Sequence, residues 1–147
     1  MRLQNVIYIN APWERVLALA ADVERWPERL PHYRRVRLLQ RQGRRTTAEM
    51  AARRGRIPVR WLALQEVRPE ERRILFTHTG GLTRGMAVEW TFTPSSPGVR
   101  VAIVHVLPWR PPLSWIAEAI VGRLFIAPIA NRTLRRIKAL SEAGGAG

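Results

Sequence analysis

The sequence contains no cysteine, only one lysine and only one aspartate. Without cysteine the chain has no disulfide framework, no thiol nucleophile and no thiolate metal ligand. Lys138 stands beside 24 arginines, and Asp22 stands beside ten glutamates. The net charge of +14 is therefore carried by arginine, and it produces a field that attracts phosphate, anionic lipid or acidic ligands. A chain encoded by a GC-rich genome uses arginine in the same way without any such partner.

Targeting segments and common catalytic motifs are also absent. Residues 1–10 lack the apolar core and small-residue cleavage site of a signal peptide. The apolar stretch 113–130 carries Glu118 and Arg123 and is interrupted by Pro128, so it is too short and too charged for a membrane span. The sequence has no G-x-S-x-G elbow, P-loop or G-x-G-x-x-G fingerprint. We therefore expect a soluble, cytoplasmic protein.

Most of the chain is a succession of strand-like segments. A short strand at 4–9 precedes a helix that has Pro12 and Glu14 in its first turn. This helix breaks near Trp26 and Pro27, because proline disfavours α geometry in the residue before it. Turn-forming residues then separate six further strand-like runs, at 33–42, 45–54, 57–67, 73–79, 84–94 and 98–108.

A long helical region is expected at about 113–141. Its apolar residues recur at helical spacing, and Pro128 should kink it or divide it into two pieces. Strands that follow one another at hairpin spacing predict an antiparallel sheet. Packing the apolar face of that sheet on the apolar stripe of the helix gives an α+β domain, with a curved sheet wrapped around the helix. We expect a single domain over 1–143 and a flexible tail at 144–147.

Three short motifs add a family resemblance. They are an A-P-x-E-x-V helix start at Ala11, Pro12, Glu14 and Val16, a W-P-x-x-x-P segment at Trp26, Pro27 and Pro31, and a G-x-R-V strand start at Gly98, Arg100 and Val101. With these motifs in this element order, the chain resembles the START-like, Bet v 1-like superfamily. Within it, the chain is similar to the bacterial polyketide cyclase/dehydrase and coenzyme-Q-binding branch. The resemblance covers essentially the whole chain.

The resemblance implies a fold and a general function. The implied fold is the helix-grip, in which a seven-stranded antiparallel sheet grips a long C-terminal helix and two short helices follow the first strand. The implied function is binding of a hydrophobic small molecule (lipid, quinone or polyketide-like) in an internal tunnel. Some relatives only carry their ligand, whereas others cyclise and aromatise a polyketide. We favour a carrier or binding protein, with a polyketide cyclase or aromatase as the alternative, and we expect no cofactor.

Candidate ligand-binding residues come from the apolar faces of the strands and of the last helix. Side chains alternate between two faces in the strands that contain 86–92 and 99–107. Ligand cavities are mostly apolar with a few placed polar groups. Taken singly, each of these residues is better explained as an ordinary core residue, but the cavity that the resemblance implies should bring some of them into contact with a ligand. The expected lining is Trp61, Phe76, His78, Met86, Val88, Trp90, Phe92, Ile103, His105, Phe125, Ile129 and Thr133, with Gln65 as a further polar candidate; Trp26, Leu30 and His32 are expected at the tunnel mouth.

The histidines are the candidate chemical groups. His105 follows the apolar alternation, so it either binds or protonates a ligand carbonyl or is a satisfied structural histidine. If the protein is an enzyme, we expect His105 to transfer a proton and an arginine to hold an enolate or carboxylate. The spacing of His32, His78 and His105 contains no local pair typical of metal ligands, so we expect no metal.

The run from Arg34 to Arg60 contains ten arginines and one acid, Glu49. Three interpretations remain open. The run forms a solvated basic face, contacts an anionic membrane, or binds nucleic acid or the ribosome. We place nucleic acid last, because neither an RNP-type aromatic pattern nor a recognition-helix motif accompanies the arginines. The sequence gives no prediction of oligomeric state.

Overall fold

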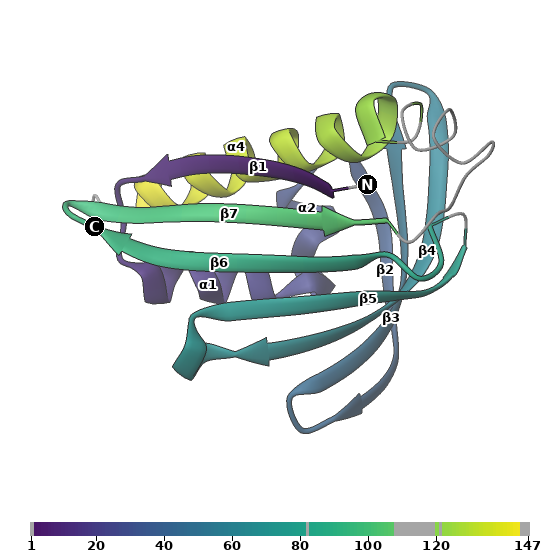
Figure 1. The fold of residues 1–147 in the computed structure, drawn as a ribbon, viewed down its shortest axis with the longest axis horizontal. Helices are drawn as coiled ribbons and strands as arrows, with labels where there is room; N and C mark the ends of the chain where they lie inside the picture. Colours follow the sequence, from purple (N-terminus) through teal and green to yellow (C-terminus); the bar gives the residue numbers. More distant parts are fainter. Residues whose placement is uncertain (1, 82, 108–119, 121, 145–147) are drawn as a thin grey trace.

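The computed structural model of the protein describes residues 2–81, 83–107, 120 and 122–144 (Figure 1). One strand precedes two short helices, six further strands and the C-terminal helix, as the sequence predicts. The bounds are β1 Arg2–Ile9, α1 Trp13–Ala21, the 3₁₀ turn η1 Val23–Arg25, α2 Trp26–Arg29, β2 Tyr33–Gln42, β3 Arg45–Arg54, β4 Ile57–Arg68, the 3₁₀ turn η2 Pro69–Glu71, β5 Arg73–Gly81, β6 Ala87–Ser95, β7 Gly98–Val106, the π-helical turn η3 Gly122–Ile126 and α4 Ala127–Gly144.

The seven strands form one antiparallel sheet in the order β1-β7-β6-β5-β4-β3-β2. Register shifts in the β2–β3 pair, and between Leu62 and Ala63 in the β4–β5 pair, add bulges of the kind that bend a sheet. Figure 1 shows the curved sheet around α4, which lies along β1 and also contacts β3 and α1. The predicted helix-grip fold is confirmed.

The hairpin between β5 and β6 differs from the prediction. β5 extends to Gly81 and β6 begins at Ala87, whereas the sequence suggested strands at 73–79 and 84–94. Gly81 has a φ of +95°, and a Cβ at this residue would lie 2.6 Å from the carbonyl oxygen of Arg60 on β4. The glycine therefore lets β5 turn while it stays tightly packed against β4.

The C-terminal helix changes its geometry near Pro128. The π-helical turn η3 ends at Ile126, and α4 begins at Ala127. Pro128 has no amide hydrogen, and the wider π turn beside it accommodates the missing helical hydrogen bond. The predicted helical residues 113–119 and 121, and the end of the predicted strand at Pro108, lie outside the described residues. Of the predicted tail, Gly144 ends α4, and 145–147 are also outside them.

Polar contacts fix α4 along β1. The Asn5 side chain, on the inner face of β1, donates a 2.8 Å hydrogen bond from Nδ2 to Oδ1 of Asn131. Farther along the helix, Lys138 donates from Nζ to the backbone oxygen of Tyr8 at 2.8 Å. These two contacts fix the position of α4 along the sheet and thereby determine which of its residues face the concave side of the sheet. Within the described residues, no helix is both long and apolar enough to cross a membrane.

Candidate functional site

A cavity of about 260 Å³ lies between the concave face of the sheet and the C-terminal helix. All strands except β1 contribute to its wall, together with α2, η3, α4 and the β5–β6 connection. The lining residues are Trp26, Tyr33, Met50, Ile57, Pro58, Val59, Arg60, Trp61, Phe76, His78, Thr83, Met86, Val88, Trp90, Ile103, His105, Phe125, Ile126, Ile129, Ala130 and Thr133. Among these described residues there is no carboxylate, and the only permanent charge is that of Arg60.

Aromatic rings form a continuous wall of this cavity. Trp26 of α2 lies with its ring centroid 4.9 Å from Tyr33 and 6.2 Å from Trp90. Tyr33 in turn contacts Trp61 edge-on at 5.9 Å. Trp61 stacks on the imidazole of His78, with centroids 5.6 Å apart and an interplanar angle of 2°. These rigid flat surfaces suit a flat or ring-containing ligand, because aromatic side chains pack best against rings and aliphatic groups.

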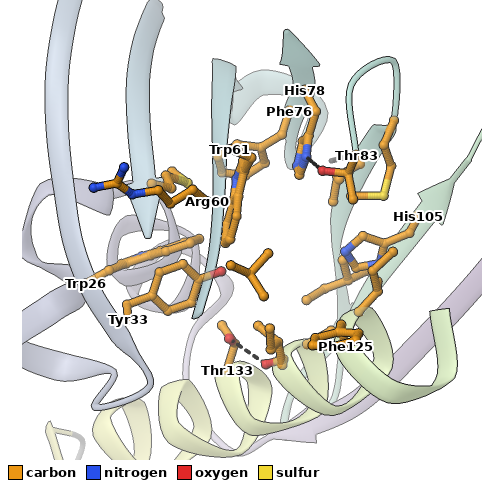
Figure 2. A pocket seen from close by; sticks show the side chains of 18 of the residues that line it. Trp26, Tyr33, Arg60, Trp61, Phe76, His78, Thr83, His105, Phe125 and Thr133 are labelled. Carbon is orange, nitrogen blue, oxygen red and sulfur yellow. Dashed lines mark hydrogen bonds between the residues drawn. The ribbon is translucent and has the colours of Figure 1, made fainter. Parts of the chain in front are cut away.

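His78 of β5 and His105 of β7 form one polar end of the cavity. Figure 2 shows His78, Thr83 and His105 together, with Nδ1 of His78 hydrogen bonded to the Thr83 hydroxyl at 2.6 Å. Burial lowers the pKa of His78 to about 3, with a smaller contribution from nearby His105, and burial also lowers the pKa of His105 to about 4. Both imidazoles are therefore uncharged at neutral pH and offer hydrogen bonds rather than charge.

The second ring nitrogen of His105 is an available polar atom at this end. Nδ1 of His105 is fully buried without a hydrogen-bond partner. Nε2 has no hydrogen bond to any described residue either, but it is not among the fully buried atoms. His105 lines the cavity, so Nε2 is the atom through which it can reach a ligand.

The other polar group centres on Thr133 of α4. Its hydroxyl lies 2.8 Å from the Ile129 carbonyl oxygen, to which it donates, and 2.8 Å from Nε2 of His32. Because the threonine proton goes to Ile129, Nε2 of His32 must be the donor in the second bond. Burial lowers the pKa of His32 to about 4, with a contribution from the charge of Arg132 and opposition from a hydrogen bond to Ile129. Burial raises the pKa of Tyr33, and a hydrogen bond with Thr133 partly offsets this.

The cavity includes every residue of the expected lining except Phe92. Phe92 follows the same alternation on β6 but lies farther along the strand, where its ring stacks on Trp90. Gln65 is also buried, and its side chain donates to the backbone oxygen of Ala21 at 3.0 Å. Gln65 therefore holds the end of α1. Ligand binding by the lining residues stays a prediction.

The segment expected at the tunnel mouth is buried. Trp26 lines the cavity but is only 3% exposed, and Leu30 and His32 are buried without being part of the lining. The reason is that α2 packs against β2, and His32, just before β2, is hydrogen bonded to Thr133 of α4. Exposed lining residues mark the opening instead, notably Ile57, which is 54% exposed at the β3–β4 hairpin.

Several lining residues were not singled out from the sequence. Met50 could have been found, because Ala48, Met50 and Ala52 alternate as Trp61 and Ala63 do on the next strand. Tyr33 and Thr83 carried no such pattern: one is the first residue of a strand and the other lies in a connection. Their position in the wall depends on how α2 and the β5–β6 hairpin fold back.

Among the described residues, no arginine is placed to hold an anionic group inside the cavity. Arg60 lies on the strand position that faces away from the buried residues Trp61 and Ala63, and Figure 2 shows its guanidinium directed away from the cavity. In the described part of the chain, no three His, Cys, Asp or Glu side chains gather closely enough to hold a metal ion. The absence of a metal cofactor remains a prediction.

Comparison by sequence gives one family. Residues 9–135 match the family model described as polyketide cyclase / dehydrase and lipid transport. The matched region contains every cavity-lining residue. No curated protein matches the chain in sequence.

Solved structures share the fold over nearly the whole chain. A protein of Thermus thermophilus is 26% identical, with a TM-score of 0.84 over 98% of this chain and 99% of that one. The ZhuI aromatase/cyclase of Streptomyces sp. R1128 is 16% identical, with a TM-score of 0.76 over 98% of both chains. A START superfamily protein of Mycobacterium smegmatis is 14% identical, with a TM-score of 0.74 over 97% of both chains.

Proposed function

The chain belongs to the polyketide cyclase / dehydrase and lipid transport family, and we propose that it binds an uncharged, hydrophobic small molecule between its sheet and α4. The observation that carries this proposal is the character of the cavity wall. Aromatic and aliphatic side chains dominate it, and the polar groups within it are neutral imidazoles and hydroxyls. Burying an ion beside such groups would cost several kcal/mol without a countercharge.

The size of the cavity limits the ligand. Its volume of about 260 Å³ lies just below the usual range of small-molecule sites, roughly 300 to 1,000 Å³. A molecule with one or two fused rings, or a single short chain, fits this space better than a lipid with two long chains. Nε2 of His105 would make one hydrogen bond with such a ligand, whereas the Thr133 hydroxyl is already engaged by Ile129 and His32.

Native mass spectrometry of protein purified from its own host tests the binding proposal. We expect a bound molecule that is released on denaturation and carries no ionised group. Replacing Ala130, a buried lining residue of α4, with phenylalanine fills the cavity and should abolish the bound mass. Ala139→Phe, at an exposed position of the same helix, is the matched control and should retain it. Repeatedly empty spectra, or a ligand retained by Ala130→Phe, would overturn the proposal.

A second candidate function is cyclisation or aromatisation of a bound polyketide-like precursor. The aromatase/cyclase ZhuI has the same fold, but the observation in this chain that favours the candidate is Nε2 of His105, which lines the cavity and has no partner among the described residues. Because the pKa of His105 is lowered to about 4, the imidazole would act as a proton acceptor or hydrogen-bond donor rather than as an acid. Turnover of a polyketide-like precursor that His105→Ala leaves undiminished would remove this residue from the mechanism.

A further inference from the structure

Large aliphatic side chains are exposed where the cavity reaches the surface. Ile57 lines the cavity and is 54% exposed, and Leu124, next to the lining residue Phe125, is also 54% exposed. Single exposed apolar residues are ordinary on soluble proteins, but adjacent ones mark an interaction surface. Figure 1 places the β3–β4 hairpin, which carries Ile57, beside the start of the C-terminal helix, which carries Leu124. Both segments border the cavity, through the lining residues Ile57 and Phe125.

The arginines of the basic run fall into two groups. Four of them are paired with acids: Arg35 and Arg37 with Glu49, Arg44 with Glu70, and Arg45 with Glu66. At the β3–β4 hairpin, by contrast, Arg54 and Arg56 have no ion pair with any described residue. The two hairpin arginines therefore keep a charge that no described acid neutralises, as Arg34 and Arg41 on β2 also do.

Free arginines and exposed aliphatic residues occupy the same place. Arg54 lies directly opposite Ile57 in the β3–β4 register, and both belong to the strand positions that face the concave side of the sheet. Arg123, exposed and without an ion pair in the described residues, precedes Leu124 on η3. We call Arg54, Arg56, Ile57, Arg123 and Leu124 the rim. It contains three cations, two aliphatic side chains and no acid.

We infer that the rim docks on the surface of an anionic lipid bilayer. Arginines attract anionic headgroups, and aliphatic side chains held among them enter the boundary between headgroups and acyl chains. A nucleic acid would use the arginines but would gain little from Ile57 and Leu124. A hydrophobic molecule leaving the cavity through this opening would then pass into the bilayer without crossing bulk water. The docking itself does not depend on which molecule the cavity binds.

Co-sedimentation with vesicles tests this inference. The full chain should bind vesicles of phosphatidylcholine mixed with phosphatidylglycerol and should not bind vesicles of phosphatidylcholine alone. Binding should weaken as salt is raised, because the range of the surface potential shortens to about 8 Å at 0.15 M ionic strength. Equal binding to both kinds of vesicle, or binding unaffected by salt, would overturn the inference.

Substitutions in the rim should act through both parts of the surface. Each basic residue near an anionic bilayer strengthens binding about fivefold, so Arg54→Gln with Arg56→Gln should weaken it about 25-fold. Ile57→Ser with Leu124→Ser should weaken it by about tenfold or more. All four residues are exposed, so the folded state should be retained, which circular dichroism verifies.

Matched controls use the same substitutions elsewhere on the surface. Arg34 and Arg41 are exposed arginines of β2 without ion pairs in the described residues, and Leu39 is 48% exposed. Arg34→Gln with Arg41→Gln, and Leu39→Ser, should change binding by less than about twofold.

Equal loss of vesicle binding in the controls would mean that only net charge matters. Loss with the arginine pair alone would mean a polyanion contact, and a change of oligomeric state in Ile57→Ser with Leu124→Ser would mean contact with a second copy. Each of these outcomes would overturn the inference.

Discussion

At the scale of single residues, the Thr133 hydroxyl joins α4 to the segment that follows α2. It donates to the Ile129 carbonyl oxygen and accepts from Nε2 of His32. Thr133→Val keeps the shape but leaves the buried His32 donor without an acceptor. We expect the free energy of unfolding to fall by about 1 to 3 kcal/mol, measured by urea denaturation. Thr133→Ser retains the hydroxyl and should recover most of the loss; equal stability of the valine variant and the parent would contradict this role.

The three buried histidines make stability depend on pH. Their pKa values are about 4, 3 and 4 for His32, His78 and His105 in the folded protein, against about 6.5 when unfolded. Above pH 6.5 both states are neutral and stability is complete. As the pH falls from about 6.5 toward 4, these histidines bind protons in the unfolded chain but stay neutral in the folded chain. The free energy of unfolding therefore decreases. Each histidine contributes a loss of about 2 kcal/mol by pH 5.

Urea denaturation at about pH 7.5 and about pH 5 measures this effect. His105→Phe removes one of the three groups and should reduce the difference in unfolding free energy between the two pH values by about a third. The comparison between pH values within each variant removes any change in packing that the phenylalanine causes. An unchanged pH difference in His105→Phe would mean that His105 has the same pKa in the folded and unfolded states.

Predictability from sequence differs among these residues. His78 and His105 lie on strands whose alternation assigns them to the inner face, and the cavity contains both. His32 lies between α2 and β2, where no periodicity applies. It is buried because Thr133 of α4, 101 residues later in the chain, packs against it. Local pattern cannot contain that information, so the sequence did not show that His32 is buried against α4.

At the scale of elements, the β5–β6 hairpin depends on one glycine. Gly81 has a φ of +95°, and an added Cβ would lie 2.6 Å from the Arg60 carbonyl oxygen. Gly81→Ala therefore combines backbone strain with a clash, and we expect it to destabilise the protein by about 3 kcal/mol. Gly43→Ala is the control: φ is +57° there, but nothing lies within 4 Å, so strain alone should cost about 1 kcal/mol. Thermal unfolding of both variants checks this, and equal losses would contradict a role for the clash.

The strands were easier to predict than their ends. β2 and β3 have the bounds that the sequence suggested, because Gly43 and Gly55 mark the turns between polar strand ends. The β5–β6 connection contains glycines at both edges, at Gly81 and Gly85, so turn composition alone could not say where β6 begins. The decisive factor is the contact of Gly81 with β4, which is a relation between elements and not a property of the segment.

At the scale of the whole molecule, the net charge of +14 opposes the compact state. Ten ion pairs between described residues offset part of this repulsion, but most of them are exposed and contribute little. Salt shortens the range of electrostatic interactions from about 30 Å at 0.01 M to about 8 Å at 0.15 M. We therefore expect thermal stability to rise over this range of salt.

Scanning calorimetry or circular dichroism at the two salt concentrations measures this rise. The variant with Arg54→Gln and Arg56→Gln has two fewer unpaired cations, so it should be more stable than the parent at low salt and should gain less from added salt. A melting temperature that falls with salt would mean that the ion pairs of Glu49 and Glu66 outweigh the repulsion.

The overall architecture could be predicted because many weak patterns agree. Strand spacing, inner-face alternation and one amphipathic helix each favour the same α+β arrangement, and the family motifs add the topology. The arginine run shows the limit of such reasoning. Its composition is uniform from Arg34 to Arg60, yet cross-strand partners neutralise some arginines and leave others without a described acid. Only the register between strands separates the two groups.

The aromatic wall also means that intrinsic tryptophan fluorescence can report on what occupies the cavity. Of the four tryptophans in the described part of the chain, Trp26, Trp61 and Trp90 line the cavity, and only Trp13 lies elsewhere. A ligand that absorbs in the near ultraviolet would quench their emission on entering, so libraries of unlabelled compounds can be screened by titration. Trp61 stacks on His78, whose pKa of about 3 keeps the imidazole uncharged, and the emission baseline of this indole should stay flat through neutral and mildly acidic solutions.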